Sequence, residues 1–164
     1  MKIAKILSVT VLATGLGLAG VFAGPNTTQA EAKSTLKTFP KSFRHNWYES
    51  AGKRGNAIKI TAKKASMRYD TNTRFTHFQL HARKLPIHKI KNTNKWSWMY
   101  ATKHHGTIHI KPWGTMQTLP LEGSYRVKTK TYKNHKIKVL QNVSGGQVNE
   151  SYYTTKKLAS HFNK

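Results

Sequence analysis

Residues 125–139 read YRVKTKTYKNHKIKV, and their pattern indicates the class of fold most clearly. Tyr125 and Val127 alternate with basic residues in its first half. Ile137 and Val139 do the same in its second half, with the polar turn signal KNH between the two halves. Alternation with a period of two is typical of a strand that is buried on one face. The stretch therefore predicts two strands with a turn between them, each with an apolar face and a basic face.

The same alternation occurs elsewhere in the chain. Ile58 and Ile60 are separated by a lysine, and Ile108 and Ile110 by a histidine. Turn signals rich in Gly, Pro, Asn and Asp recur between such segments. We expect a mainly β domain of about eight strands, folded either as an antiparallel, lipocalin-like barrel or as a sandwich. A short C-terminal helix is expected over residues 154–162.

The N-terminus has the pattern of a secretory signal. Lys2 and Lys5 precede residues 6–22, which carry no charge, and small residues follow as far as Ala32. A positive start, an apolar middle and small residues at the end predict a signal peptide with its cleavage region over 1–32. The alternative is an uncleaved anchor, for which the apolar run is short. We expect a secreted or cell-surface protein.

The rest of the chain predicts one folded unit. Residues 33–38 are small and polar and are expected to form a flexible lead-in, followed by a single basic β domain over 39–164. The chain contains no Cys, which excludes disulfides and thiolate metal sites. Packing alone is expected to hold the domain together.

The opening of this domain, FPKSFRHNWYE at 39–49, resembles that of small secreted proteins of lactic-acid bacteria, which begin with a P-x-x-[LF]-R-G-T-W-Y-like motif. The segment IKIT at 58–61 and the closing residues Tyr152 and Tyr153 are similar too. The resemblance implies export and a β fold rather than an activity. The opening also resembles the first strand of lipocalin-type barrels, in which Gly precedes Trp by two residues. Trp47 matches that pattern, whereas His45 stands in place of the Gly.

The charge is strongly one-sided. The chain has 29 Lys and Arg against 5 Asp and Glu, and removal of 1–32 leaves 27 against 4, a formal charge of +23. Such a field attracts anionic polymers. The expected partners are anionic cell-wall polymers such as teichoic acid, with an anionic lipid surface or DNA as alternatives. In the latter cases the protein would be a cationic antimicrobial or DNA-binding factor. The candidate polyanion-binding residues lie on the predicted strands: Lys59, Lys63, Lys111, Arg126, Lys128, Lys130, Lys136 and Lys138.

Aromatic residues form a second candidate site. Three of them, Trp96, Trp98 and Tyr100, share one strand parity, and Trp113 lies in a turn signal. These side chains and Trp47 are expected to fill the core, because large aromatic residues dominate cores. Two alternatives remain. One is a barrel cavity for a small apolar ligand, and the other is a stacking platform for sugars or bases.

The sequence lacks the usual signs of an enzyme. It has no Gly-x-Ser-x-Gly motif and no phosphate-binding loop. The mature chain has four carboxylates, which are expected to be counter-ions of lysines. His77 and His81 would stand about 13 Å apart on one strand, too far to share a metal directly. We therefore expect a non-enzymatic binding protein with no cofactor and no metal; its oligomeric state is left open.

Overall fold

The computed structural model describes residues 35–50, 55–85, 97–114 and 119–163, which all lie in the unit Glu31–Lys164. The predicted signal region and Trp96 lie outside these residues. The elements in chain order are η1 (Lys41–Phe43), β1 (Asn46–Tyr48), β2 (Ala57–Ile60), β3 (Lys64–Arg68), β4 (Thr76–Leu80), β5 (Trp98–His104), β6 (Thr107–Pro112), β7 (Gly123–Tyr132), β8 (His135–Ser144), β9 (Gln147–Tyr153) and α1 (Lys156–Phe162).

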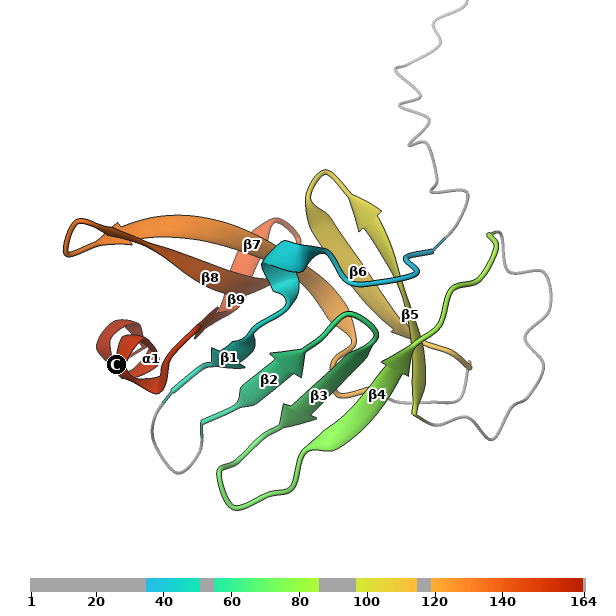
Figure 1. Ribbon diagram of the computed structural model, residues 1–164, viewed down its shortest axis with the longest axis horizontal. Coiled ribbons are helices and arrows are strands. Elements are labelled where there is room, and N and C mark those ends of the chain that lie inside the picture. The colour runs from blue at the N-terminus through green and yellow to red at the C-terminus, as the bar shows by residue number, and fades with distance from the viewer. Residues whose placement is uncertain (1–34, 51–54, 86–96, 115–118, 164) are drawn as a thin grey trace, which may run out of the picture. The chain divides into compact units, whose positions relative to one another are not determined.

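The strands form a closed barrel in sequence order, from β1 to β9 (Figure 1). The barrel closes where Tyr48 of β1 pairs with Tyr153 of β9. This confirms the barrel and the short C-terminal helix. The barrel is not wholly antiparallel, however, because β4 and β5 pair in parallel. Parallel pairing requires a long crossover connection, and the chain from 81 to 97 has the necessary length.

The barrel interior holds the main core. Trp47 is fully buried there, and its indole Nε1 donates a hydrogen bond to the Phe43 carbonyl oxygen at 2.8 Å. The predicted alternation is confirmed in β2, in β6 and at Tyr125. The buried members of this core are Phe39, Phe43, Trp47, Ile58, Ile60, Ala65, Met67, Phe78, Leu80, Met99, Ala101, Ile108, Ile110, Leu119, Leu121, Tyr125, Leu140 and Tyr152.

A second, smaller core lies outside the barrel wall, beneath α1. Val139, Tyr153 and Ala159 are buried in it, with Leu158 and Phe162 packed against them. The rings of Tyr153 and Phe162 stack with centroids 5.0 Å apart. The Thr155 side chain caps the helix by accepting a hydrogen bond from the Leu158 backbone N–H. The helix is therefore fixed to β8 and β9 by apolar contact.

The chain enters the barrel earlier than the sequence indicates. The backbone N–H of Thr35 donates to the Arg83 carbonyl oxygen at 3.1 Å, and that of Leu36 to the Ala101 carbonyl oxygen at 2.7 Å. From Thr35 onwards the predicted lead-in is thus hydrogen-bonded to the barrel. None of the helices in the described part of the chain is both long and apolar enough to cross a membrane.

Strands β7 and β8 form a hairpin that extends past its neighbours (Figure 1). Pairing with β6 ends at Arg126, and pairing with β9 begins at Val139. Lys133 and Asn134 form the tip with φ of 46° and 63°. Positive φ at both residues of a two-residue loop is the turn geometry that matches strand twist. Between Arg126 and Val139 the two strands therefore pair only with each other.

The register of this hairpin corrects the prediction of one lysine-rich sheet face. Lys128 lies opposite Val139, and Lys130 lies opposite Ile137. Directly paired residues of antiparallel strands point to the same side. Lys128 and Lys130 thus share the outer face with the apolar residues beneath α1, whereas Lys136, like Lys138, lies on the opposite face. The reason is that β8 contacts an apolar layer on each side, the barrel core and the helix.

Candidate functional site: the basic exterior of the barrel

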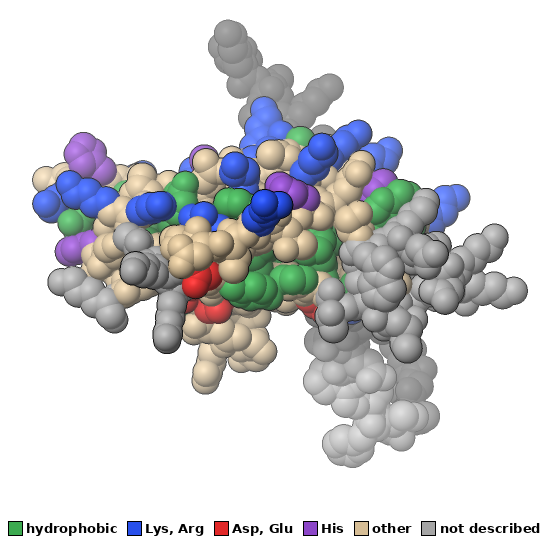
Figure 2. All heavy atoms as spheres, turned by 90° about the horizontal axis from the view of Figure 1, so that it is seen from below, with side chains coloured by type: hydrophobic (Ala, Val, Ile, Leu, Met, Phe, Trp, Pro, Cys, Tyr) green, Lys and Arg blue, Asp and Glu red, His purple; other side chains and the backbone are tan. Residues whose placement is uncertain are grey.

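The predicted basic residues surround the barrel. All seven lysines of the set are exposed, and Arg126 is half-buried, with its Nε donating to Gln141 Oε1 at 2.9 Å. Figure 2 shows Lys and Arg side chains along the whole length of one face, with acidic side chains visible only in small areas. Within the described ranges, no Lys or Arg forms an ion pair with a carboxylate within 4.0 Å. The positive charge is therefore uncompensated.

A groove separates the tip of the β7–β8 hairpin from α1, and we call it the hairpin–helix groove. Its volume is about 540 Å³. The residues that line it combine two lysines, a histidine, hydroxyls and apolar surface, without a carboxylate: Tyr132, Lys133, Thr155, Lys157, Leu158, Ser160 and His161. This composition can take an anionic group together with an uncharged, sugar-like part.

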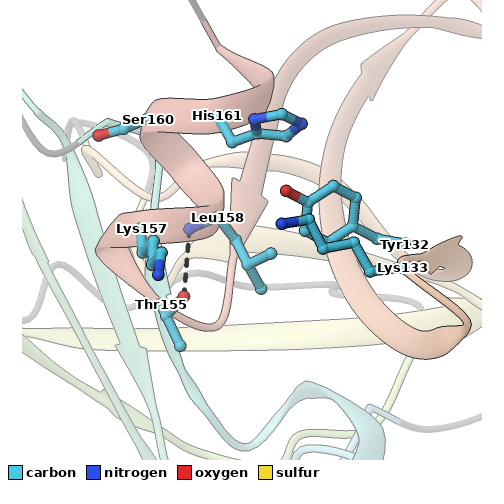
Figure 3. Close-up of a pocket in the computed structure, with 7 residues that line it drawn as sticks. All are labelled: Tyr132, Lys133, Thr155, Lys157, Leu158, Ser160 and His161. Atoms are coloured by element: carbon cyan, nitrogen blue, oxygen red, sulfur yellow. Dashed lines mark hydrogen bonds between the residues drawn. The ribbon is translucent and has the colours of Figure 1, made fainter.

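The side chains of this groove come from both of its walls. Figure 3 shows Leu158 and His161 pointing from the helix toward Tyr132 and Lys133 of the hairpin, whereas Ser160 points away. The rings of His161 and Tyr132 lie 4.8 Å apart, and Lys133 Nζ lies 5.6 Å from the Tyr132 ring centroid. Aromatic and cationic groups thus lie next to each other at the mouth of the groove.

A second pocket, of about 180 Å³, opens on the outer face of β1, β2 and β3, and we call it the β1–β3 pocket. Three cationic side chains line it, again without a carboxylate. Its residues are Asn46, Trp47, Tyr48, Ala57, Ile58, Lys59, Arg68, Phe75 and Lys156. Sequence reasoning included Lys59 but missed Arg68 and Lys156, because only the fold brings β3 and the start of α1 beside β2.

The two pockets lie on either side of the start of α1. Lys157 lines the hairpin–helix groove and Lys156 lines the β1–β3 pocket. Because these two lysines are consecutive in the chain, the two pockets have neighbouring lining residues. The outer face therefore carries a basic track from the hairpin across α1 to β1–β3. Lys130 lies on this track, with its Nζ 5.5 Å from the Phe162 ring centroid.

The other lysine pair of the hairpin lies away from this track. Lys138 Nζ is 3.2 Å from His45 Nε2. Burial and the charge of Lys138 together lower the pKa of His45 below its ordinary value. The neutral ring of His45 can then accept a hydrogen bond from the ammonium group. Lys138 therefore already has a hydrogen-bond partner within the chain, and its ammonium group is less available to a polyanion.

The candidate aromatic residues are divided by the barrel wall. Trp47 lies in the core, whereas Trp98, Tyr100 and Trp113 are half-buried. Trp98 pairs with exposed Gln79 on the outer side, next to inward-facing Met99. Trp47 and Trp98 therefore cannot line one interior cavity, which corrects that alternative. Trp96 lies outside the described residues.

The outer aromatic residues form a cluster with Arg83. The rings of Trp98 and Trp113 meet edge to face at 5.4 Å, and His81 stacks on Trp98 at 3.5 Å. The guanidinium of Arg83 lies 4.4 Å from the Trp113 ring centroid and 5.2 Å from that of Tyr100. Aromatic rings beside one cationic group fit the platform that the sequence suggests as an alternative, although the rings are already in contact with one another.

Two of the carboxylates expected as lysine counter-ions have other partners. Glu150 accepts hydrogen bonds from the Tyr152 hydroxyl at 2.6 Å and from Asn142 Nδ2 at 3.5 Å. Burial and the charge of Glu150 raise the pKa of Glu49. Burial and the hydrogen bond to Glu150 raise the pKa of Tyr152. These groups form a polar cluster rather than ion pairs.

Two histidines lie within hydrogen-bond distance of serine hydroxyls. His77 Nδ1 lies 2.8 Å from Ser66 Oγ, and His109 Nδ1 lies 2.7 Å from Ser124 Oγ. Burial, then the charges of His104 and Lys111, lower the pKa of His109. In the part of the chain that the structure describes, no three His, Cys, Asp or Glu side chains are grouped so that they could hold a metal ion.

Comparison with protein families, with curated proteins and with solved structures finds no match to this chain. The resemblance of its opening residues to small secreted proteins of lactic-acid bacteria therefore stays an expectation.

Proposed function

We propose that this is an exported, non-enzymatic protein that adheres to anionic polymers of the cell envelope, such as teichoic acid, through the basic track. The observation that carries the proposal is the lack of a carboxylate along this track. From residue 123 to residue 144 the hairpin contains five lysines and one arginine, with no Asp or Glu. Both pockets are likewise lined without an acidic residue.

Binding would follow from the release of counter-ions. Each lysine that contacts a phosphate displaces a condensed cation from the polymer, so the affinity falls steeply as salt rises. Lysines greatly outnumber arginines in this chain, which suits repeated diffuse contacts better than bidentate recognition of one group.

The test is sedimentation of the protein with purified cell walls, with and without their teichoic acids, across a salt series. We expect binding that requires the anionic polymer and fades as salt rises. Vesicles with anionic lipids and double-stranded DNA serve as parallel arms. Tighter binding to either of these than to walls, or wall binding that is unchanged when teichoic acid is removed, would overturn the proposal.

A further inference from the structure

One small residue, Ala57, lines the β1–β3 pocket between two large neighbours. Tyr48, Ala57 and Arg68 are direct cross-strand partners and form one row on the outer side of three strands. Ala57 is only 2% exposed although it faces outward. Its methyl group lies between two large side chains and is among the groups that line the pocket. A larger residue at this position would fill the space.

Cationic groups reach this hollow from three elements. Lys59 comes from β2, Arg68 from β3 and Lys156 from the start of α1. Lys59 Nζ lies 5.4 Å, and Arg68 Cζ 5.0 Å, from the centroid of the Phe75 ring. Attraction to the face of one ring holds both cations at this wall of the pocket. Like charges are thus brought together with no anion among the lining residues.

The guanidinium of Arg68 has an unused donor. Its Nε is buried and has no hydrogen-bond partner, and its Nη1 reaches the Thr71 carbonyl oxygen only at 3.5 Å. A buried donor without a partner is unfavourable, and a guanidinium that turns toward a bound oxygen anion would relieve this cost. The planar guanidinium matches two oxygens of a phosphate, and Lys59 and Lys156 line the same pocket.

We propose that the β1–β3 pocket binds a single phosphate group, and that in the envelope this group belongs to the phosphodiester backbone of the bound polymer. The proposal rests on the proposed function for the source of the phosphate, but the site itself is defined by its own residues. It differs from diffuse attraction because it requires both the hollow above Ala57 and the fork of Arg68.

The test is calorimetric titration of the purified protein with inorganic phosphate, glycerol phosphate and a glycerol phosphodiester, at constant ionic strength. We expect saturable binding to one site. Ala57→Ile fills the pocket without a change of charge and suits a strand, and it should weaken binding about tenfold, the scale of a lost hydrogen bond to a charged group. Arg68→Lys keeps the charge but removes the fork and should weaken binding similarly.

Lys41→Gln is the matched control, because it removes one exposed cation outside the pocket. It should leave phosphate affinity unchanged. Lys156→Gln provides a second pocket variant if Ala57→Ile fails to fold, and circular dichroism checks the fold of each. Loss of a cation from the first turn of a helix is not expected to destabilise the helix.

Equal weakening by Lys41→Gln and Lys156→Gln, or full affinity in Ala57→Ile, would overturn the site. Binding of inorganic phosphate without binding of the phosphodiester would overturn its assignment to the polymer. Wall binding of the same variants is measured in parallel. The hairpin lysines remain in Ala57→Ile, so we expect this variant to keep salt-sensitive wall binding. If the parent protein shows no phosphate binding but still binds walls, the site fails while the proposed function stands.

Discussion

The two lysine pairs of the β7–β8 hairpin lie on opposite faces, so replacing one pair should change wall binding more than replacing the other. Lys128 and Lys130 lie on the outer face with the basic track, whereas Lys136 and Lys138 lie on the other face. A linear polymer that follows the outer face contacts only the first pair. Replacement of both lysines of one pair by glutamine should therefore weaken wall binding for the outer pair much more than for the inner pair.

The size of the effect follows from the number of contacts. In nucleic acids, each lost phosphate contact reduces the slope of log K against log salt by about 0.7–0.9. Two lost contacts then correspond to a decrease in affinity of about 15- to 30-fold at about 0.15 M salt. The inner pair should change affinity by about threefold or less, because charges far from the polymer are screened.

The assay is wall sedimentation at several salt concentrations for both double variants. The double variant Lys37→Gln, Lys41→Gln is the control, because it removes two exposed charges near the N-terminal end of the described chain. Equal losses for the outer and inner pairs would refute the reasoning from the strand register. A loss of the same size in the control would show that only net charge matters.

Three further predictions concern the fold. Trp47→Ala should lower the free energy of unfolding by about 3–5 kcal/mol, the cost of truncating a fully buried large aromatic side chain, as measured by urea denaturation. Tyr152→Phe removes the 2.6 Å hydrogen bond to Glu150 and should cost about 1.5–3 kcal/mol in the same assay; an unchanged midpoint would contradict the role given to that bond. The pKa of His109 is lowered in the folded protein. Below the ordinary histidine pKa of about 6.5, the unfolded chain therefore binds more protons than the folded protein, and the free energy of unfolding decreases as the pH decreases. Thermal melts from pH 7.5 to 5 should show a smaller decrease in His109→Gln than in the parent protein, and an equal decrease would exclude this histidine as a source.

The class of fold and the sign of the charge can both be inferred from the amino-acid sequence alone. Period-two alternation at Ile58 and Ile60, and at Ile108 and Ile110, identified strands with one buried face, because only the pleated backbone places every second residue on the same side. The excess of basic residues needs no structure to be recognised. The turn KNH was visible for the same local reason, since positive φ at Lys133 and Asn134 is a property of the loop itself.

Which basic residues lie next to one another depends on the tertiary structure. Ile137 and Val139 look like ordinary core residues, but they pack beneath α1, outside the barrel, and this places their lysine neighbours on the face opposite to Lys128 and Lys130. Likewise, Lys59, Arg68 and Lys156 line one pocket because of the strand register and the position of the helix. These contacts join residues far apart in the chain, so no local pattern of the sequence contains them.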